Sequence, residues 1–161
     1  MQLNIKSCEV LADIRSAAWL EQELHPEADR HRRHQMADIC ETDNLELVWR
    51  VLGTAIAEIQ LELTKILQPA KDVDEDNDLR CPREWRFSFL FRLPTQTLEY
   101  IREKIHEYLV AKVMADRTAV IIPSASKTWQ QRAEVTIAAL RSISATARPP
   151  FRPVCRPLWP M

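Results

Sequence analysis

The longest hydrophobic pattern in the chain runs over residues 42–68, where apolar side chains recur at steps of three and four. This spacing matches the 3.6-residue period of an α-helix and predicts one apolar face. Asp43 and Glu46 form an acidic variant of the capping box, so we expect the helix to begin near residue 43. Pro69 restricts the residue before it and lacks a donor, so the helix should close at Gln68. The apolar positions are Leu45, Val48, Trp49, Leu52, Ala55, Ile56, Ile59, Leu63, Ile66 and Leu67.

A second long helix is expected over residues 95–116, opened by Leu93-Pro94-Thr95. Its apolar stripe makes it the expected packing partner of the helix at 43–67, and together they should be the two longest helices. The core positions that we expect from this pair are Trp49, Leu52, Ile56, Ile59, Leu98, Ile101 and Ile105.

Three shorter patterns predict further helices. Ser7 is a suitable N-cap for a helix over residues 8–24, which has a clear apolar stripe. Pro26 and the acidic residues after it suit the first turn of a short helix ending near Ile39. After Pro123, a last helix is expected over residues 127–146.

One segment, residues 85–93, has the period of two that is typical of a half-buried β-strand. A single strand cannot satisfy its own backbone, so it must pair with Thr118–Ile122, with the linker at 69–84, or with another copy. Aromatic side chains beside an arginine row could also stack nucleic-acid bases, although a core face is the commoner use. The alternating apolar residues are Trp85, Phe87, Phe89, Phe91 and Leu93.

Composition indicates a mainly α protein. One glycine and ten prolines in 161 residues are a poor supply for the tight turns of an all-β fold. We therefore expect a bundle of four to five helices with one short strand or hairpin. Residues 1–147 should form a single helical domain that contains a mobile acidic linker at 69–84, and residues 148–161 an extended tail.

Metal, cofactor and catalytic motifs are not found in the sequence. His31 and His34 lie among arginines that repel a cation, and the acidic linker has neither the glycine nor the glutamate of a calcium loop. With one glycine, no glycine-built phosphate cradle is available, and no nucleophile elbow or pair of catalytic carboxylates is recognisable. We therefore expect no enzyme and no cofactor.

The cysteine spacing and the hydropathy of the chain indicate where in the cell the protein is expected to be. Four cysteines lie far apart without a Cys-x-x-Cys motif, which suits free thiols in a reducing cytoplasm. No apolar run approaches the 18 residues of a membrane span, and no basic region followed by a hydrophobic stretch marks export. We expect a cytoplasmic protein that does not engage a membrane. The cysteines are Cys8, Cys40, Cys81 and Cys155.

Charge is divided unevenly along the chain. Residues 1–116 carry 15 Lys/Arg against 22 Asp/Glu, whereas residues 117–161 carry 7 against 1. The net charge of −1 therefore conceals an acidic and a basic part. This asymmetry suggests association with an acidic surface or with other copies of the chain.

The last fourteen residues, 148–161, combine five prolines with regularly spaced arginines and no acid. Proline favours an extended chain of low entropy, which suits docking into a groove on a partner, with a disordered end as the alternative. The residues that we expect to dock are Arg148, Phe151, Arg152, Arg156, Leu158 and Trp159.

The order of these parts resembles the head–tail connector, or adaptor, proteins of tailed bacteriophages and prophages. The resemblance rests on the acid-capped helix from Asp43 to Leu67, a variable loop, the helix opened by Leu93-Pro94 that runs through Tyr108 and Arg117, and a terminal helix leading into an arginine-bearing tail. It covers about residues 43–152. The acidic linker and the proline-rich end depart from the family pattern.

The resemblance implies a structural function in a virion. Copies would assemble side by side into a ring that joins the capsid portal to the tail, with DNA present only as the content of the channel. Portal and tail proteins would be the partners, first in the bacterial cytoplasm and then in the virion. The family supplies no catalytic residues.

Two other function classes remain open from the sequence. One is a bacterial cytoplasmic protein-interaction module or regulator that docks a partner through its Pro/Arg-rich tail. The other is nucleic-acid binding by the basic residues, which would show a steep dependence on salt.

Overall fold

The protein is mainly helical, with five helices and a two-stranded antiparallel sheet among the described residues, which confirms the expected fold class. The structure, a computed structural model, describes residues 1–26, 30–68 and 83–147. The elements are β1 (Gln2–Lys6), α1 (Ser7–Leu24), α2 (Arg30–Ala37), α3 (Thr42–Glu62), β2 (Glu84–Ser88), α4 (Thr95–Ile121) and α5 (Pro123–Thr146).

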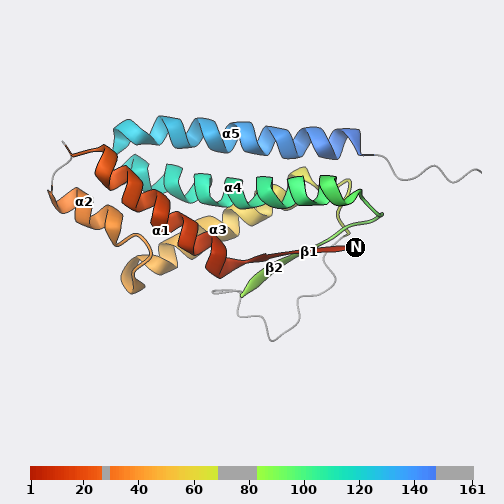
Figure 1. The fold of residues 1–161 in the computed structure, drawn as a ribbon, viewed down its shortest axis with the longest axis horizontal. Coiled ribbons are helices and arrows are strands. Elements are labelled where there is room, and N and C mark those ends of the chain that lie inside the picture. The colour runs from red at the N-terminus through yellow and green to blue at the C-terminus, as the bar shows by residue number, and fades with distance from the viewer. Residues whose placement is uncertain (27–29, 69–82, 148–161) are drawn as a thin grey trace, which may run out of the picture.

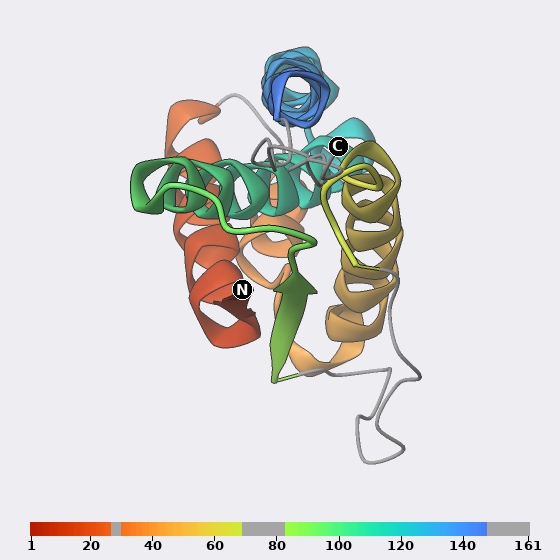
Figure 2. The ribbon, with the colours of Figure 1, turned by 90° about the vertical axis from the view of Figure 1, so that its right-hand side faces the viewer.

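Helix α4 is the centre of the fold. It packs most extensively against α5 and also contacts α1, α2, α3 and β1. Viewed nearly along α5, that helix lies on one side of α4, and α1 and α3 lie apart from each other on the opposite side (Figure 2). The helix expected at 43–67 therefore does pack on α4, as predicted, but α4 and α5 are the two longest helices.

The long axis of the molecule follows the antiparallel pair α4 and α5 (Figure 1). Only Ile122 separates the two helices, and its extended backbone, with φ −133° and ψ 78°, is typical of a residue that precedes proline. Pro123 then occupies the first turn of α5, where its missing N–H is not needed. The last helix thus begins at Pro123 and not at the expected residue 127.

The two-stranded sheet brings the N-terminal residues 2–6 beside residues 84–88. Strand β1 pairs antiparallel with β2 in the register Gln2 to Ser88 and Lys6 to Glu84. Leu3 and Ile5 of β1 are buried, and Gln2, Asn4 and Lys6, which alternate with them, are exposed. Ser7, expected to cap α1, is instead its first residue, and its hydroxyl donates a hydrogen bond of 2.9 Å to the carbonyl of Arg83.

Within the described residues the aromatic strand pairs with β1, which was not among the expected partners. Residues 118–121, which were the first candidate, form the last turn of α4. The hydroxyl of Thr118 donates to the carbonyl of Met114 at 2.6 Å, and Val120 is exposed, so the segment is stable as helix. The true partner, β1, is five residues long with only two apolar positions, which is too short a pattern to recognise.

Helix α3 ends at Glu62, five residues before Leu67, the last residue of the helix expected at 43–67. The chain then turns, and the amides of Ile66 and Leu67 donate to the carbonyl of Leu63. Beyond the turn, Leu67 forms an isolated antiparallel bridge with Phe89. Pairing with the segment after β2 therefore replaces the last helical turn and keeps the backbone groups satisfied.

Several expected features fall outside the described residues or differ locally. Glu41 occupies the N-cap position of α3 and makes no side-chain capping hydrogen bond, so the helix begins one residue before the expected position. The side chain of Asp43, and with it the expected capping box, lies outside what the structure describes. The short second helix spans only Arg30–Ala37. The mobile-linker prediction falls mainly on 69–82, which, like the predicted tail at 148–161, lies outside the described residues.

Candidate interaction surfaces

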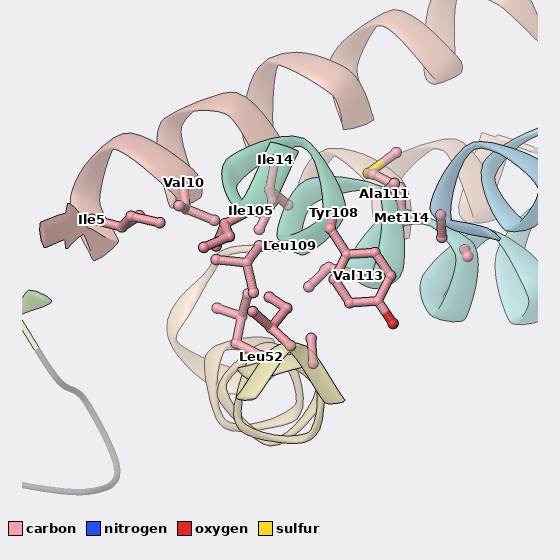
Figure 3. Close-up of a cluster of buried hydrophobic side chains, with 14 of the residues drawn as sticks. Ile5, Val10, Ile14, Leu52, Ile105, Tyr108, Leu109, Ala111, Val113 and Met114 are labelled. Atoms are coloured by element: carbon pink, nitrogen blue, oxygen red, sulfur yellow. The ribbon is translucent and has the colours of Figure 1, made fainter. Parts of the chain in front are cut away.

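The seven expected core residues all contact the hydrophobic core, but to different depths. Trp49, Ile56 and Leu98 are partly buried and pack against it. Figure 3 shows Leu52 of α3 pointing toward Leu109 of α4, with Ile105 beside them. The remaining four, Leu52, Ile59, Ile101 and Ile105, are fully buried. The six residues expected to dock a partner lie outside the described part of the chain.

The first candidate surface is a groove of about 520 Å³ between α3, α4 and α5, which we call the polar groove. On one wall, Lys112 Nζ lies 3.0 Å from both carboxylate oxygens of Glu58, and the hydroxyl of Tyr108 donates to the same carboxylate. On the other, Arg141 of α5 makes a bidentate pair with Glu62 of α3 at 2.6 and 2.8 Å. The charged groups thus link three helices.

These contacts fix the protonation states of the polar groove. Burial, reinforced by the hydrogen bond to Glu58, raises the pKa of Tyr108 far above its ordinary value of 10.0. Partial burial raises the pKa of Glu58, but the donors from Tyr108 and Lys112 outweigh it and leave that pKa below the ordinary 4.5. At neutral pH the Tyr108 hydroxyl is therefore protonated and donates, and the Glu58 carboxylate is ionised and accepts. This arrangement is suited to holding helices together.

We predict that Tyr108→Phe lowers the free energy of unfolding at pH 7 by about 1 kcal/mol, because one donor to a partly exposed carboxylate is lost. The folded-state pKa of Tyr108 is raised, so this contribution is present below pH 10 and is lost as the pH rises through the folded-state value. Urea unfolding at pH 7 measures the loss. Tyr100→Phe, at an exposed position, is the control, and an equal loss in both variants would contradict the assigned role.

The second candidate surface is a groove of about 1050 Å³ between α1, α4 and the first part of α5, which we call the acidic groove. One end has exposed or partly buried apolar side chains, of which Leu20 and Leu24 are 53% and 68% exposed. Val110 and Trp129 line the groove on the α4 and α5 sides. The carboxylates that line it are Glu9, Asp13, Glu21, Glu99, Glu103 and Glu107.

Two contacts hold α1 against α4 along this groove. A carboxylate oxygen of Asp13 lies 2.7 Å from His106 Nε2, and a carboxylate oxygen of Glu9 lies 3.6 Å from a guanidinium nitrogen of Arg102. These pairs show that α1 and α4 run in the same direction here, because residues 9 and 13 face residues 102 and 106. The acidic end of the groove therefore lies near the start of both helices, and the apolar end lies further along.

Two further contacts join α5 to the same groove. The indole Nε1 of Trp129 donates to Glu21 at 2.8 Å. Glu107 accepts from Lys104 at 2.7 Å and from Arg132 at 3.1 Å, and these hydrogen bonds hold the pKa of Glu107 below its ordinary value despite partial burial. Four of the six carboxylates thus have donors within the chain.

Glu99 and Glu103 differ from the other four. Both are exposed, and neither makes a side-chain hydrogen bond or an ion pair within 4 Å with another described residue; the charge of Glu103 contributes only a minor part of the raised pKa of Lys104, whose ammonium group is held by Glu107. They lie one turn apart on α4, where like charges repel by about 0.2–0.5 kcal/mol. Two carboxylates at the acidic end are therefore available to a cation from another molecule.

Part of this surface is visible in the sequence as a regular spacing of acidic residues. Glu99, Glu103 and Glu107 recur at steps of four, which places them on one face of the predicted helix at 95–116. The contribution of α1 could not be found in this way, because it depends on how the helices pack. The sequence pattern points to residues 148–161 for partner binding, whereas the described part of the chain has a groove that can receive a partner.

Other site classes find little support in the described residues. No group of three His, Cys, Asp or Glu side chains among them could hold a metal ion. Cys8 is exposed, and Cys40 is buried, and both are free thiols. Burial raises the pKa of the Cys40 thiol, which makes it a poor nucleophile. In the described ranges, no helix has the length and apolar character needed to cross a membrane.

Comparisons with known proteins give no independent family assignment. No family model matches the chain, and neither the curated proteins nor the solved structures contain a match to it.

Proposed function

We propose that this chain is a non-catalytic structural subunit, a phage or prophage head–tail connector that assembles with copies of itself into a ring between portal and tail. The order of described elements supports this proposal. A long amphipathic helix, α3, is followed by β2, by Leu93-Pro94 at the start of α4, and by a terminal helix, α5. These are the parts on which the resemblance to connectors rests.

The observation that carries the proposal is the separation of charge on a chain with a receiving groove. Six carboxylates line the acidic groove on α1, α4 and α5, whereas the sequence after residue 116 carries 7 Lys/Arg against 1 acid. Of those seven, Arg132 lines the groove itself beside Glu107, and Arg141 pairs with Glu62. Most of the cations left for a neighbouring copy therefore lie in residues 148–161. Surfaces that differ from each other but are complementary support head-to-tail contacts between identical subunits. Such contacts form a closed ring when the rotation between neighbours closes.

Native mass spectrometry and negative-stain electron microscopy test the proposal on the full chain. Each measurement is made on the protein alone and after mixing with the portal protein of the same phage or prophage. We expect closed rings of one copy number, alone or on the portal. Raising NaCl from about 0.05 M to 0.5 M should weaken the assembly, because salt screens exposed charge pairs. A chain that stays monomeric under both conditions overturns the proposal.

The second candidate is a helical protein-interaction module that docks a partner through its Pro/Arg-rich segment. The apolar surface of α1 favours it, because Trp19, Leu20 and Leu24 are each more than half exposed, and neighbouring exposed apolar side chains mark protein contacts. In the same experiments, this function predicts a monomer that does not bind the portal protein. Binding to DNA with a steep salt dependence would instead favour the nucleic-acid class.

A further inference from the structure

We propose that the acidic groove is the docking site for residues 148–161 of a neighbouring copy of this chain. The inference deepens the proposed ring and rests on it for the identity of the occupant. It assigns one groove, one segment and one direction of docking.

The groove has two ends with different chemistry. At the acidic end, Glu99 and Glu103 are exposed, and no hydrogen bond or close ion pair among the described residues occupies either carboxylate, although the charge of Glu103 acts on the adjacent Lys104. At the apolar end, Leu20 and Leu24 leave more than half of their surface in contact with solvent. An occupant that satisfies both ends must carry cations followed by apolar side chains.

The segment 148–161 has this composition in this order. Arg148, Arg152 and Arg156 supply guanidinium groups, which form bidentate contacts with carboxylates. Leu158 and Trp159 follow them and supply apolar anchors. None of its side chains is acidic, so no side chain of the segment repels the carboxylates of the groove.

The dimensions of the groove also suit this segment. From Glu9 to Leu24, α1 lines the groove for 15 residue steps, or about 22 Å at the rise of an α-helix. In an extended proline-rich chain, at about 3.1 Å per residue, Arg152 and Trp159 are separated by about 22 Å. Arg152 and Arg156 can therefore lie at the carboxylate end while Leu158 and Trp159 reach Leu20 and Leu24.

The docking segment is more easily supplied by a neighbouring copy than by the same chain, because the backbone is extended directly after α5 ends. Ala147, directly after the helix, has φ −65° and ψ 121°. Arg148 and Pro149 each precede a proline, which disfavours the helical conformation at both positions. A tight reversal back toward α1 and α4 is thus opposed by Pro149 and Pro150. A copy placed beyond the end of α5 needs no such reversal.

A peptide experiment tests the groove without requiring any ring. A labelled peptide of residues 148–161 is titrated, by fluorescence anisotropy, into the full-length R152E/R156E variant, whose own segment should not compete. The expected result is saturable binding that falls at least about tenfold when E99K/E103K is added to the same protein. E46K/E134K, which changes two exposed glutamates outside the groove, has the same net charge and should bind like its parent. Absence of binding, or equal binding to all three proteins, overturns the proposal.

A mixing experiment distinguishes a neighbouring copy from the same chain. The E99K/E103K variant keeps its segment but loses its groove, and the R152E/R156E variant keeps its groove but loses its segment. Each should self-associate at least about tenfold more weakly than the parent, and the two mixed should form one-to-one complexes that grow no further. Docking within one chain predicts no rescue on mixing, and that result overturns the proposal. Rings formed equally well by all variants would reject the groove and leave the connector function standing.

Discussion

The Leu52→Ala variant is expected to lose about 2–5 kcal/mol of its free energy of unfolding. Leu52 is completely buried on α3 and points toward Leu109 of α4 (Figure 3). Alanine favours the helix at least as well as leucine does, so the loss comes from the cavity and from the lost apolar burial. Urea unfolding followed by far-UV circular dichroism measures it.

The next residue provides the control for this variant. Gly53 is exposed on the same helix, and a Cβ placed there meets no other atom within 4 Å. Gly53→Ala should therefore raise the free energy of unfolding by up to about 1 kcal/mol, since glycine is the less favourable residue inside a helix. A Leu52→Ala protein that unfolds at the same urea concentration as its parent would disprove the contact between α3 and α4.

The Phe89→Ala variant should be destabilised by about 3–5 kcal/mol, the usual range for a buried aromatic side chain. Phe89 is 1% exposed and belongs to the largest fully buried side chains. Its amide donates to the carbonyl of Met1 at 2.8 Å, and it bridges Leu67, so three distant segments meet around it. Thermal unfolding monitored by circular dichroism should show a clearly lower midpoint.

Leu90→Ala is the control for Phe89→Ala. Leu90 is 52% exposed, and its backbone hydrogen bond to Ile66 does not depend on the side chain. We expect a change within about 0.5 kcal/mol. If the two variants melted alike, Phe89 would not be the centre of the contact between the sheet and the end of α3.

The helices could be predicted from the sequence because each buries one face at a local, regular spacing. The beginnings of α1, α3 and α4 lie within one residue of their expected positions. The ends of the helices are less predictable. Helix α3 ends at Glu62, and Ile66 and Leu67 pair instead with the segment after β2. This pairing involves residues more than twenty positions away in the sequence, so a local pattern cannot predict it.

Two other features could not be predicted from local sequence for the same reason: the partner of the aromatic strand, and the acidic groove. β1 is recognisable as a strand only once β2 lies beside it, because its two apolar residues are too few to form a pattern. The groove likewise exists only where α1, α4 and α5 meet. The glutamates on α4 could have been noted in advance, but their lack of cationic partners is a property of the packed molecule.

The pairing of β1 with β2 has a consequence for the order of events during synthesis. Residues 2–6 are synthesised before their partners at 84–88, which follow only about 80 residues later in the sequence. Until then Leu3 and Ile5 have no strand to cover them, and closing so long a loop is slow because of its entropy. Nascent chains of this protein should therefore be most vulnerable to aggregation and chaperone capture before residue 88 appears.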